Sequence, residues 1–262
     1  MNEEETKIWY AKFLKLSAKH KEMLEETFDS SLENIEFSKI LEITESDEDS
    51  LIIDLGANLG QQIDDIIKIG AEVHAFEPHP IISEFLEKKY EGHDRVIVKK
   101  AGAGVANDSM RFFYKGTGDE INGGASLLPW KIQEGARPEE KLKEDSTGNF
   151  TDVPVLDIGE YINNLDKQVK ILKIDIEGFE YEVLQRLLSS NAIDKIDYIL
   201  FEDHADCFAY LPWYLSALTA LYQFKTRNPA TKVFMWKGSP DIEATNVELE
   251  DELKRMLNEK DE

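Results

Sequence analysis

Acidic side chains follow two apolar runs in the second half of the chain. Asp175 and Glu177 follow the run VKILKI, and Glu202, Asp203 and His204 follow the run DYILF. If both runs are neighbouring parallel strands, their carboxyl ends meet at one edge of a sheet, where doubly wound folds bind ligands. Carboxylates and a histidine gathered there could remove a proton from a reacting hydroxyl group. Asp175, Glu177 and His204 are therefore the candidate catalytic residues.

The same acids raise a problem of charge. Carboxylates held close together repel one another unless a cation intervenes or one of them binds a proton. We therefore predict a Mg²⁺ or Mn²⁺ ion held by Asp175, Glu202 and Asp203, because both ions prefer oxygen ligands. Simpler roles remain open. An acid at 175 or 177 could cap the following helix, His204 could be an ordinary loop histidine, and Glu180 could be a surface residue that compensates the helix dipole.

The first strand-like run, LIIDL, ends in a glycine-containing turn. Gly56 and Gly60 would let a ligand approach the backbone where no side chain intervenes. The third glycine of the dinucleotide pattern G-x-G-x-x-G is missing, which disfavours a nicotinamide oxidoreductase. Asp54 suits the cationic ammonium group of a methionine moiety better than a phosphate. Glu77 ends the next run, EVHAF, and could bind both ribose hydroxyls of an adenosine ligand.

Five motifs carry a family resemblance. The segments IIDLGANLGQ, VHAFEPHP, KKAGAG, VLDIGEYI and ILKIDIEGFEYEVL occur in this order between about Leu51 and Asp203. In order and spacing they resemble the FkbM-type methyltransferases. That resemblance implies an α/β class I methyltransferase fold, a Rossmann-like doubly wound sheet of seven strands with the last strand antiparallel. It also implies S-adenosylmethionine as the methyl donor.

The resemblance also assigns the cofactor contacts, position by position. Gly56, Asn58 and Gly60 would lie near the methionine part, Glu77 near the ribose, and Ala101 and Gly102 near the adenine. Asp54, from its charge, and Pro78, which follows Glu77, are also expected to bind the cofactor. The chain departs from the usual family pattern at Phe179, where a small or polar residue is common. The spacing of Asp175, Glu202 and Asp203 looks like the divalent-metal site of the macrocin-type sugar O-methyltransferases.

Periodicity predicts the elements that must position these residues. Apolar residues at helical spacing predict two or three amphipathic helices within 1–45. From Leu51 onward, short apolar runs alternate with helical stretches, which predicts βαβ units and a parallel sheet. We expect a helical extension that packs on the core (1–48), a methyltransferase domain (49–245) and an acidic C-terminal helix or tail (246–262).

Two further segments complete the expected organisation. Residues 115–150 are rich in glycine, proline and charge and are predicted to leave the sheet as an excursion that covers the acceptor site. The runs QFKTR and KVFMW, separated by NPAT, predict a terminal antiparallel pair of strands.

Composition disfavours several classes of partner. The 262 residues carry 53 Asp and Glu against 30 Lys and Arg, a formal charge of −23 that repels nucleic acids and anionic lipids. The single cysteine excludes an intrachain disulfide and suits a reducing compartment, so we expect a cytoplasmic protein. No apolar run is long enough to span a membrane. Oligomeric state is not predictable from this pattern.

The sequence therefore predicts an S-adenosylmethionine-dependent O-methyltransferase that acts on a hydroxyl of a sugar or glycan. An alternative from another class is a non-catalytic S-adenosylmethionine-binding module in a glycan-assembly complex. Asp175 and Glu177 favour the enzyme, because a binding module would not need them.

Overall fold

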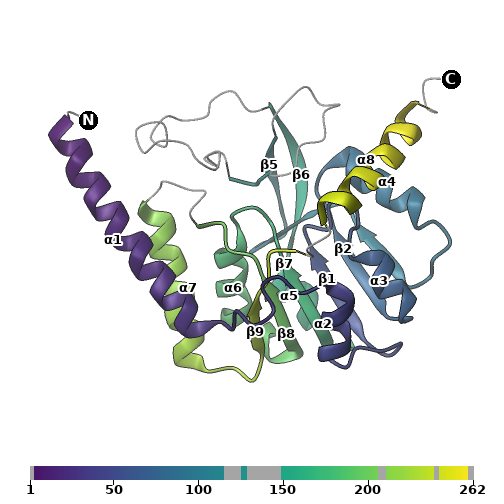
Figure 1. Ribbon diagram of the computed structural model, residues 1–262, viewed down its shortest axis with the longest axis horizontal. Coiled ribbons are helices and arrows are strands. Elements are labelled where there is room, and N and C mark those ends of the chain that lie inside the picture. Colours follow the sequence, from purple (N-terminus) through teal and green to yellow (C-terminus); the bar gives the residue numbers. More distant parts are fainter. Residues whose placement is uncertain (1–2, 115–124, 129–148, 206–210, 239–241, 259–262) are drawn as a thin grey trace.

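A central sheet of six strands organises the protein in the computed structural model, which describes residues 3–114, 125–128, 149–205, 211–238 and 242–258 (Figure 1). In spatial order the strands are β3 (Val96–Lys99), β2 (Glu72–Phe76), β1 (Leu51–Leu55), β7 (Val169–Ile174), β8 (Ile196–Phe201) and β9 (Lys232–Met235). All five pairings are parallel. The chain order reverses between β1 and β7, and their carboxyl ends therefore flank the crevice where doubly wound folds bind ligands.

Helices cover both faces of this sheet. Side chains alternate along each strand, so Ile53 and Leu55 belong to one apolar cluster and Ile52 to the other. The first cluster is covered by α1 (Glu3–Thr27), α5 (Ile158–Asn163), α6 (Glu180–Ser189) and α7 (Leu211–Arg227). The second is covered by α2 (Phe37–Ile43), α3 (Ile63–Lys68), α4 (Pro80–Lys89) and α8 (Ile242–Asn258). A short 3₁₀ helix, η1 (Ala192–Lys195), leads into β8. The protein is therefore a mixed α/β, Rossmann-like fold, as predicted.

A second, smaller sheet stands beside the central one. It contains β4 (Gly102–Gly104), β6 (Asn149–Asp157) and β5 (Asp108–Tyr114) in that spatial order. Strand β6 is parallel to β4 and antiparallel to β5. Of the predicted excursion at 115–150, residues 125–128 are described and 149–150 belong to β6, and the rest lies outside the described residues. The described part adds Ser126 to the edge of β5 through two backbone hydrogen bonds with Phe113.

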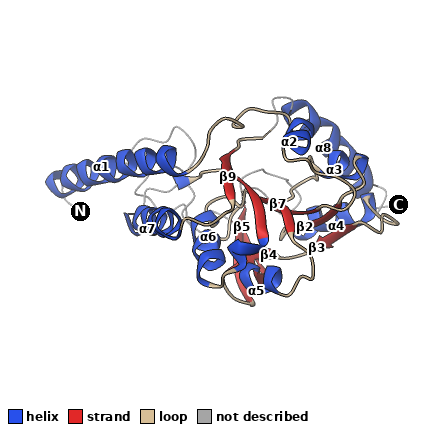
Figure 2. Ribbon diagram, turned by 90° about the horizontal axis from the view of Figure 1, so that it is seen from below, coloured by secondary structure: helices blue, strands red, loops and turns tan. Residues whose placement is uncertain are grey.

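The α1 helix lies beside α7 and extends past it, away from the sheet (Figures 1 and 2). Leu24 near the end of α1 is buried, and the buried Phe28, directly after the helix, packs on Phe201 and Phe224. None of the described helices is long and apolar enough to cross a membrane.

The predicted terminal antiparallel pair is wrong. Residues 223–227 form the last turns of α7, and β9 runs parallel to β8. Buried residues in α7 recur at helical spacing, at Tyr214, Ala217, Leu221 and Phe224, and this apolar face continues through QFKTR. The outer edge of β9 pairs instead with Asp29, which follows α1. The predicted seventh strand is therefore absent from the described central sheet.

The end of α7 can be tested by two substitutions on opposite sides of the helix. Phe224 is buried, whereas Tyr222 is 64% exposed. In a strand these two residues would share one face, but in a helix they do not. We expect Phe224→Ala to lower the free energy of unfolding by about 3–5 kcal/mol and Tyr222→Ala to change it by less than about 0.5 kcal/mol. Urea unfolding of both variants measures the difference, and similar losses would contradict the helix.

Candidate active site

The turn after β1 is pressed against the end of β7. Gly56 has a positive φ of 82°, and a Cβ atom added to it would lie 1.8 Å from the backbone oxygen of Asp175. No other residue fits there. The Gly56 and Ala57 N–H groups both donate to the carbonyl of Phe76 at the end of β2. The turn therefore joins the carboxyl ends of β1, β2 and β7.

Glu77 fixes the other side of this turn. Its Oε2 atom accepts a hydrogen bond from the Asn58 N–H at 2.9 Å, and its Oε1 atom accepts one from the His79 N–H at 2.7 Å. The carboxyl group is buried, and burial raises the pKa of Glu77 to about 7 although both N–H groups act to lower it. Each oxygen retains a second lone pair for a ligand in the adjacent pocket.

A pocket opens at the carboxyl edge of the sheet between these elements. Its walls come from the ends of β1, β2 and β7, from α4, from β4 and β5, and from residues 125–128. The lining residues are Gly56, Asn58, Phe76, Glu77, Pro78, His79, Ile82, Gly102, Ala103, Phe112, Ala125, Leu127, Asp175, Ile176 and Glu177. Apolar residues such as Ile82 and Leu127 form part of this lining, and the acids Glu77, Asp175 and Glu177 follow the ends of β2 and β7. Mostly apolar surfaces with a few placed polar groups are typical of small-molecule sites.

Lys173 lies beneath the pocket as a buried cation. Its Nζ atom is 3.1 Å from Asp54 Oδ1 and 3.3 Å from Asp175 Oδ2, and it donates a hydrogen bond to the carbonyl of Gly56 at 3.2 Å. Burial acts to lower the pKa of Lys173, but Asp54 and Asp175 outweigh it and raise the pKa above its usual value. Asp54 is therefore already paired with an ammonium group and does not line the pocket.

The loop after β7 is held by Glu180. Glu177 and Gly178 both have positive φ angles, 58° and 117°. Oε1 of Glu180 accepts hydrogen bonds from the Gly178 N–H at 2.9 Å and the Ile176 N–H at 3.2 Å. The suggestion that Glu180 is a surface residue is wrong, since its side chain is fully buried. A left-handed backbone at Glu177, an unfavourable conformation for a non-glycine residue, is thus maintained by a dedicated internal contact.

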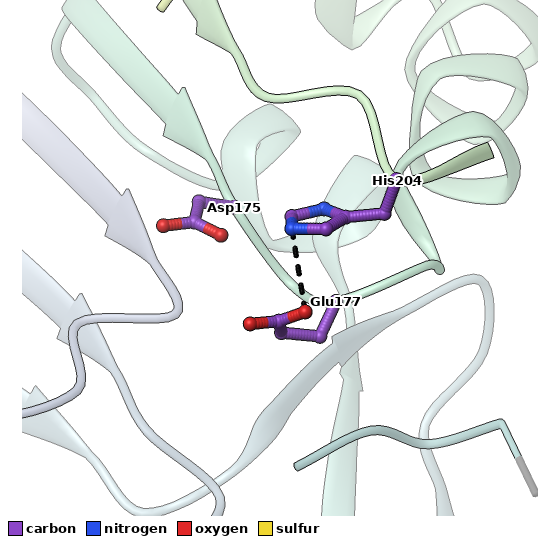
Figure 3. A group of neighbouring side chains, drawn as sticks. All are labelled: Asp175, Glu177 and His204. Carbon is purple, nitrogen blue, oxygen red and sulfur yellow. Dashed lines mark ion pairs between the residues drawn. The ribbon is translucent and has the colours of Figure 1, made fainter. Parts of the chain in front are cut away.

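His204 supplies a second positive charge to the acids of the site. Figure 3 shows its ring beside Glu177 and Asp175. Its Nδ1 atom lies 2.8 Å from Glu180 Oε1, and its Nε2 atom lies 3.3 Å from Glu177 Oε2 and 3.8 Å from Glu202 Oε1. Burial acts to lower the pKa of His204, but the charges of Glu180, Asp175 and Glu202 raise it to about 9. Burial also raises the pKa of Glu202 to about 7, so this acid holds a proton more readily. The expected repulsion is therefore relieved by an imidazolium.

The predicted metal ligands do not converge. Among the described residues, the one group whose ligand atoms lie within 4.8 Å of one another is Asp175, Glu177 and His204. Asp203 instead accepts a hydrogen bond from the Tyr181 hydroxyl, 2.8 Å away. Successive side chains of extended backbone point to opposite sides, which is why Asp203 turns away from its neighbours. An ion at the converging group would have to displace the proton of His204.

The remaining predicted cofactor residues divide into two groups. Pro78 and Gly102 line the pocket together with Gly56, Asn58 and Glu77. Ala101 is buried beside Gly102 but is not among the lining residues. A Cβ atom on Gly60 would lie 2.9 Å from Leu86, so this glycine serves helix packing.

Sequence reasoning missed Lys173 and the burial of Glu180. A lysine in an otherwise apolar central strand, two residues before Asp175, is an available signal, because a buried amine needs a charged partner. Phe179, the departure from the family pattern, is buried in the apolar core and is not among the pocket residues.

The family model described as "Methyltransferase FkbM domain" matches residues 54–222. All the residues that line the pocket fall within this range. No curated protein and no solved structure matches the chain significantly.

The close approach of Gly56 to Asp175 can be tested against a matched glycine. Gly92 has nearly the same φ, 85°, but a Cβ atom there meets nothing within 4 Å. We expect Gly92→Ala to cost about 1–2 kcal/mol of folding free energy for the left-handed backbone alone. Gly56→Ala adds a backbone clash and should cost at least about 2 kcal/mol more. Urea unfolding measures both, and equal costs would contradict the contact.

Fold stability should depend on pH through His204. The pKa of His204 is about 9 in the folded protein, against an ordinary value near 6.5. Its stabilising charge is fully present below about pH 6.5 and is lost as the pH rises through about 9. Urea unfolding at about pH 6.5 and about pH 9.5 should show a larger loss for the wild type than for His204→Gln. Equal losses would show that His204 is not held as an imidazolium.

Proposed function

Because the chain belongs to the FkbM methyltransferase family, and is therefore an S-adenosylmethionine-dependent methyltransferase, we propose that it methylates a hydroxyl oxygen and that the acceptor is a sugar or glycan. The observation that carries this proposal is the pocket in which Glu77 and Glu177 face the same space from the ends of β2 and β7. One acid suits the ribose of the donor and the other suits proton removal from the acceptor.

The residues of the pocket fit the donor. Gly56 and Asn58 line the pocket at the end of β1, and Glu77 presents a buried carboxylate for the ribose hydroxyls. The apolar lining residues, including Ile82 and Leu127, suit an adenine ring. When bound, the donor supplies a methyl group on a sulfonium, which is electrophilic. The protein has to exclude water, orient the acceptor and accept its proton.

Glu177 is the proposed base. Its carboxylate lines the pocket and lies 3.3 Å from His204 Nε2. Since the pKa of His204 is about 9, the histidine is protonated at neutral pH and is not itself available to accept a proton. We assign it the role of stabilising the charged form of Glu177. His204 and Lys173 supply the positive charge that a metal ion would otherwise have to provide, so we expect turnover to persist in EDTA.

The charge of the pocket supports a neutral acceptor rich in hydroxyls. The described lining residues include three acids and no lysine or arginine. The one basic side chain among them, His79, has a pKa lowered by burial and is therefore neutral. An anionic acceptor would be repelled by this surface, whereas the hydroxyls of a sugar can donate hydrogen bonds to the carboxylates.

Donor binding should depend on Glu77. Glu77→Ala removes a buried hydrogen-bonding carboxylate and should weaken the binding of S-adenosylhomocysteine by about 1.5–3 kcal/mol. Isothermal titration calorimetry measures this loss. Glu182→Ala, a substitution of an acid on α6 that does not line the pocket, is the control. Unchanged affinity in Glu77→Ala would place the ribose elsewhere.

Turnover should depend on Glu177. Methylated products can be identified by mass spectrometry after incubation of labelled donor with glycan extracts. We expect Glu177→Gln to lower the rate by about 10²–10⁴-fold, the usual contribution of a general base. Binding of S-adenosylhomocysteine should be unchanged, and the wild type should keep its rate in EDTA. Loss of the wild-type rate in EDTA would restore a metal at Asp175, Glu177 and His204.

A further inference from the structure

A buried histidine of α1 lies behind the candidate active site. His20 is 2% exposed and packs against Tyr181 of α6 and Tyr214 of α7, with ring centroids 5.4 Å and 5.7 Å away. Its Nε2 atom is 2.6 Å from the Tyr181 hydroxyl, although 161 residues separate the two in the sequence. A polar ring in such an interface is costly unless its nitrogen is hydrogen-bonded. The contact with Tyr181 therefore links α1 to α6.

The hydrogen bonds continue from α1 to the segment that follows β8. The Tyr181 hydroxyl donates its single proton to Asp203 Oδ1 at 2.8 Å. The proton of the 2.6 Å contact must therefore be carried by His20 Nε2. The Ala205 N–H donates to the same Asp203 oxygen at 3.1 Å. We call His20, Tyr181 and Asp203 the His20 chain.

The two neighbours of Asp203 face the other way, toward the site. The Glu202 N–H still pairs with β7, so the backbone continues the strand and its side chains alternate. Asp203 faces Tyr181. His204 Nε2 lies on the other side, 3.3 Å from Glu177 Oε2 and 3.8 Å from Glu202 Oε1. The hydrogen bond from Tyr181 to Asp203 therefore sets the direction in which the neighbouring His204 side chain points.

We propose that α1 is a positioning element of the active site, which acts through the His20 chain to keep His204 against Glu177. The family match at 54–222 does not include α1, so the match does not account for this contact. The inference rests on the proposed role of Glu177. On this basis His20 and Tyr181 are positioning residues, because neither lines the pocket.

Two substitutions interrupt the hydrogen bonds of the His20 chain with little change in packing. Tyr181→Phe removes only the hydroxyl, and His20→Leu removes the donor. His20→Gln keeps a side-chain N–H and serves as the rescue variant. Leu253→Ala creates a cavity in the cluster on the opposite face of the sheet and is the control for a general loss of stability.

The readouts are the ring resonance of His204 and the exchange rate of the Ala205 amide. The protein has five histidines, so the ring signals can be resolved by NMR and assigned with His204→Gln. In Tyr181→Phe and His20→Leu we expect the His204 signal to move and the Ala205 amide to exchange about tenfold faster or more. His20→Gln should restore both toward the wild type, and Leu253→Ala should move neither. Affinity for S-adenosylhomocysteine should stay within about twofold in all four variants, because Gly56 and Glu77 are untouched.

An unchanged His204 signal in Tyr181→Phe, or an equal displacement in Leu253→Ala, would overturn the proposal. Neither readout requires an acceptor. A failure of the His20 chain can therefore be distinguished from a failure of the proposed methyl transfer, which is judged separately by product formation from labelled donor.

Discussion

Lys173 places an ammonium group inside the protein, between the carboxylates of Asp54 and Asp175 and against the carbonyl of Gly56. This contact holds the turn after β1 against the end of β7, and residues of both segments line the pocket. A buried charge of this kind is stable only while its partners are present, and removing one partner of a buried ion pair typically costs about 3–5 kcal/mol. The other acids of the site are arranged around this fixed point, with His204 as their second cation.

The fold was largely predictable, because alternating apolar runs and helical stretches specify a parallel sheet. Three of the predicted site residues that follow a strand, Gly56, Glu77 and Glu177, line the pocket. The sequence could not show which acids are buried. Glu180 sits in the first turn of a helix, where exposed acids are common, and only the loop folded over it reveals that it binds the Gly178 N–H. The end of α7 was misjudged because QFKTR satisfies strand alternation and helical spacing equally well.

The metal hypothesis illustrates a different limit. Repulsion between the acids was predicted correctly, but the sequence could not identify the group that relieves it. Whether Asp203 or His204 faces the site depends on the phase of the extended segment after β8, and a shift of one residue would exchange them. That phase is set by long-range contacts, including the bond from Tyr181 to Asp203. Local sequence patterns carry no information about such contacts.

The topology has a consequence for how the protein acquires its binding site. Lys173 and Gly56 are 117 residues apart, and β1 pairs with β7 only after the intervening chain has been accommodated. Pairing across such a separation is slow relative to local structure formation. The half of the sheet containing β1, β2 and β3 can form first, but it lacks the far wall of the pocket. A ligand of this pocket therefore binds only to the completed sheet, and its binding stabilises the whole molecule against unfolding rather than one half of it.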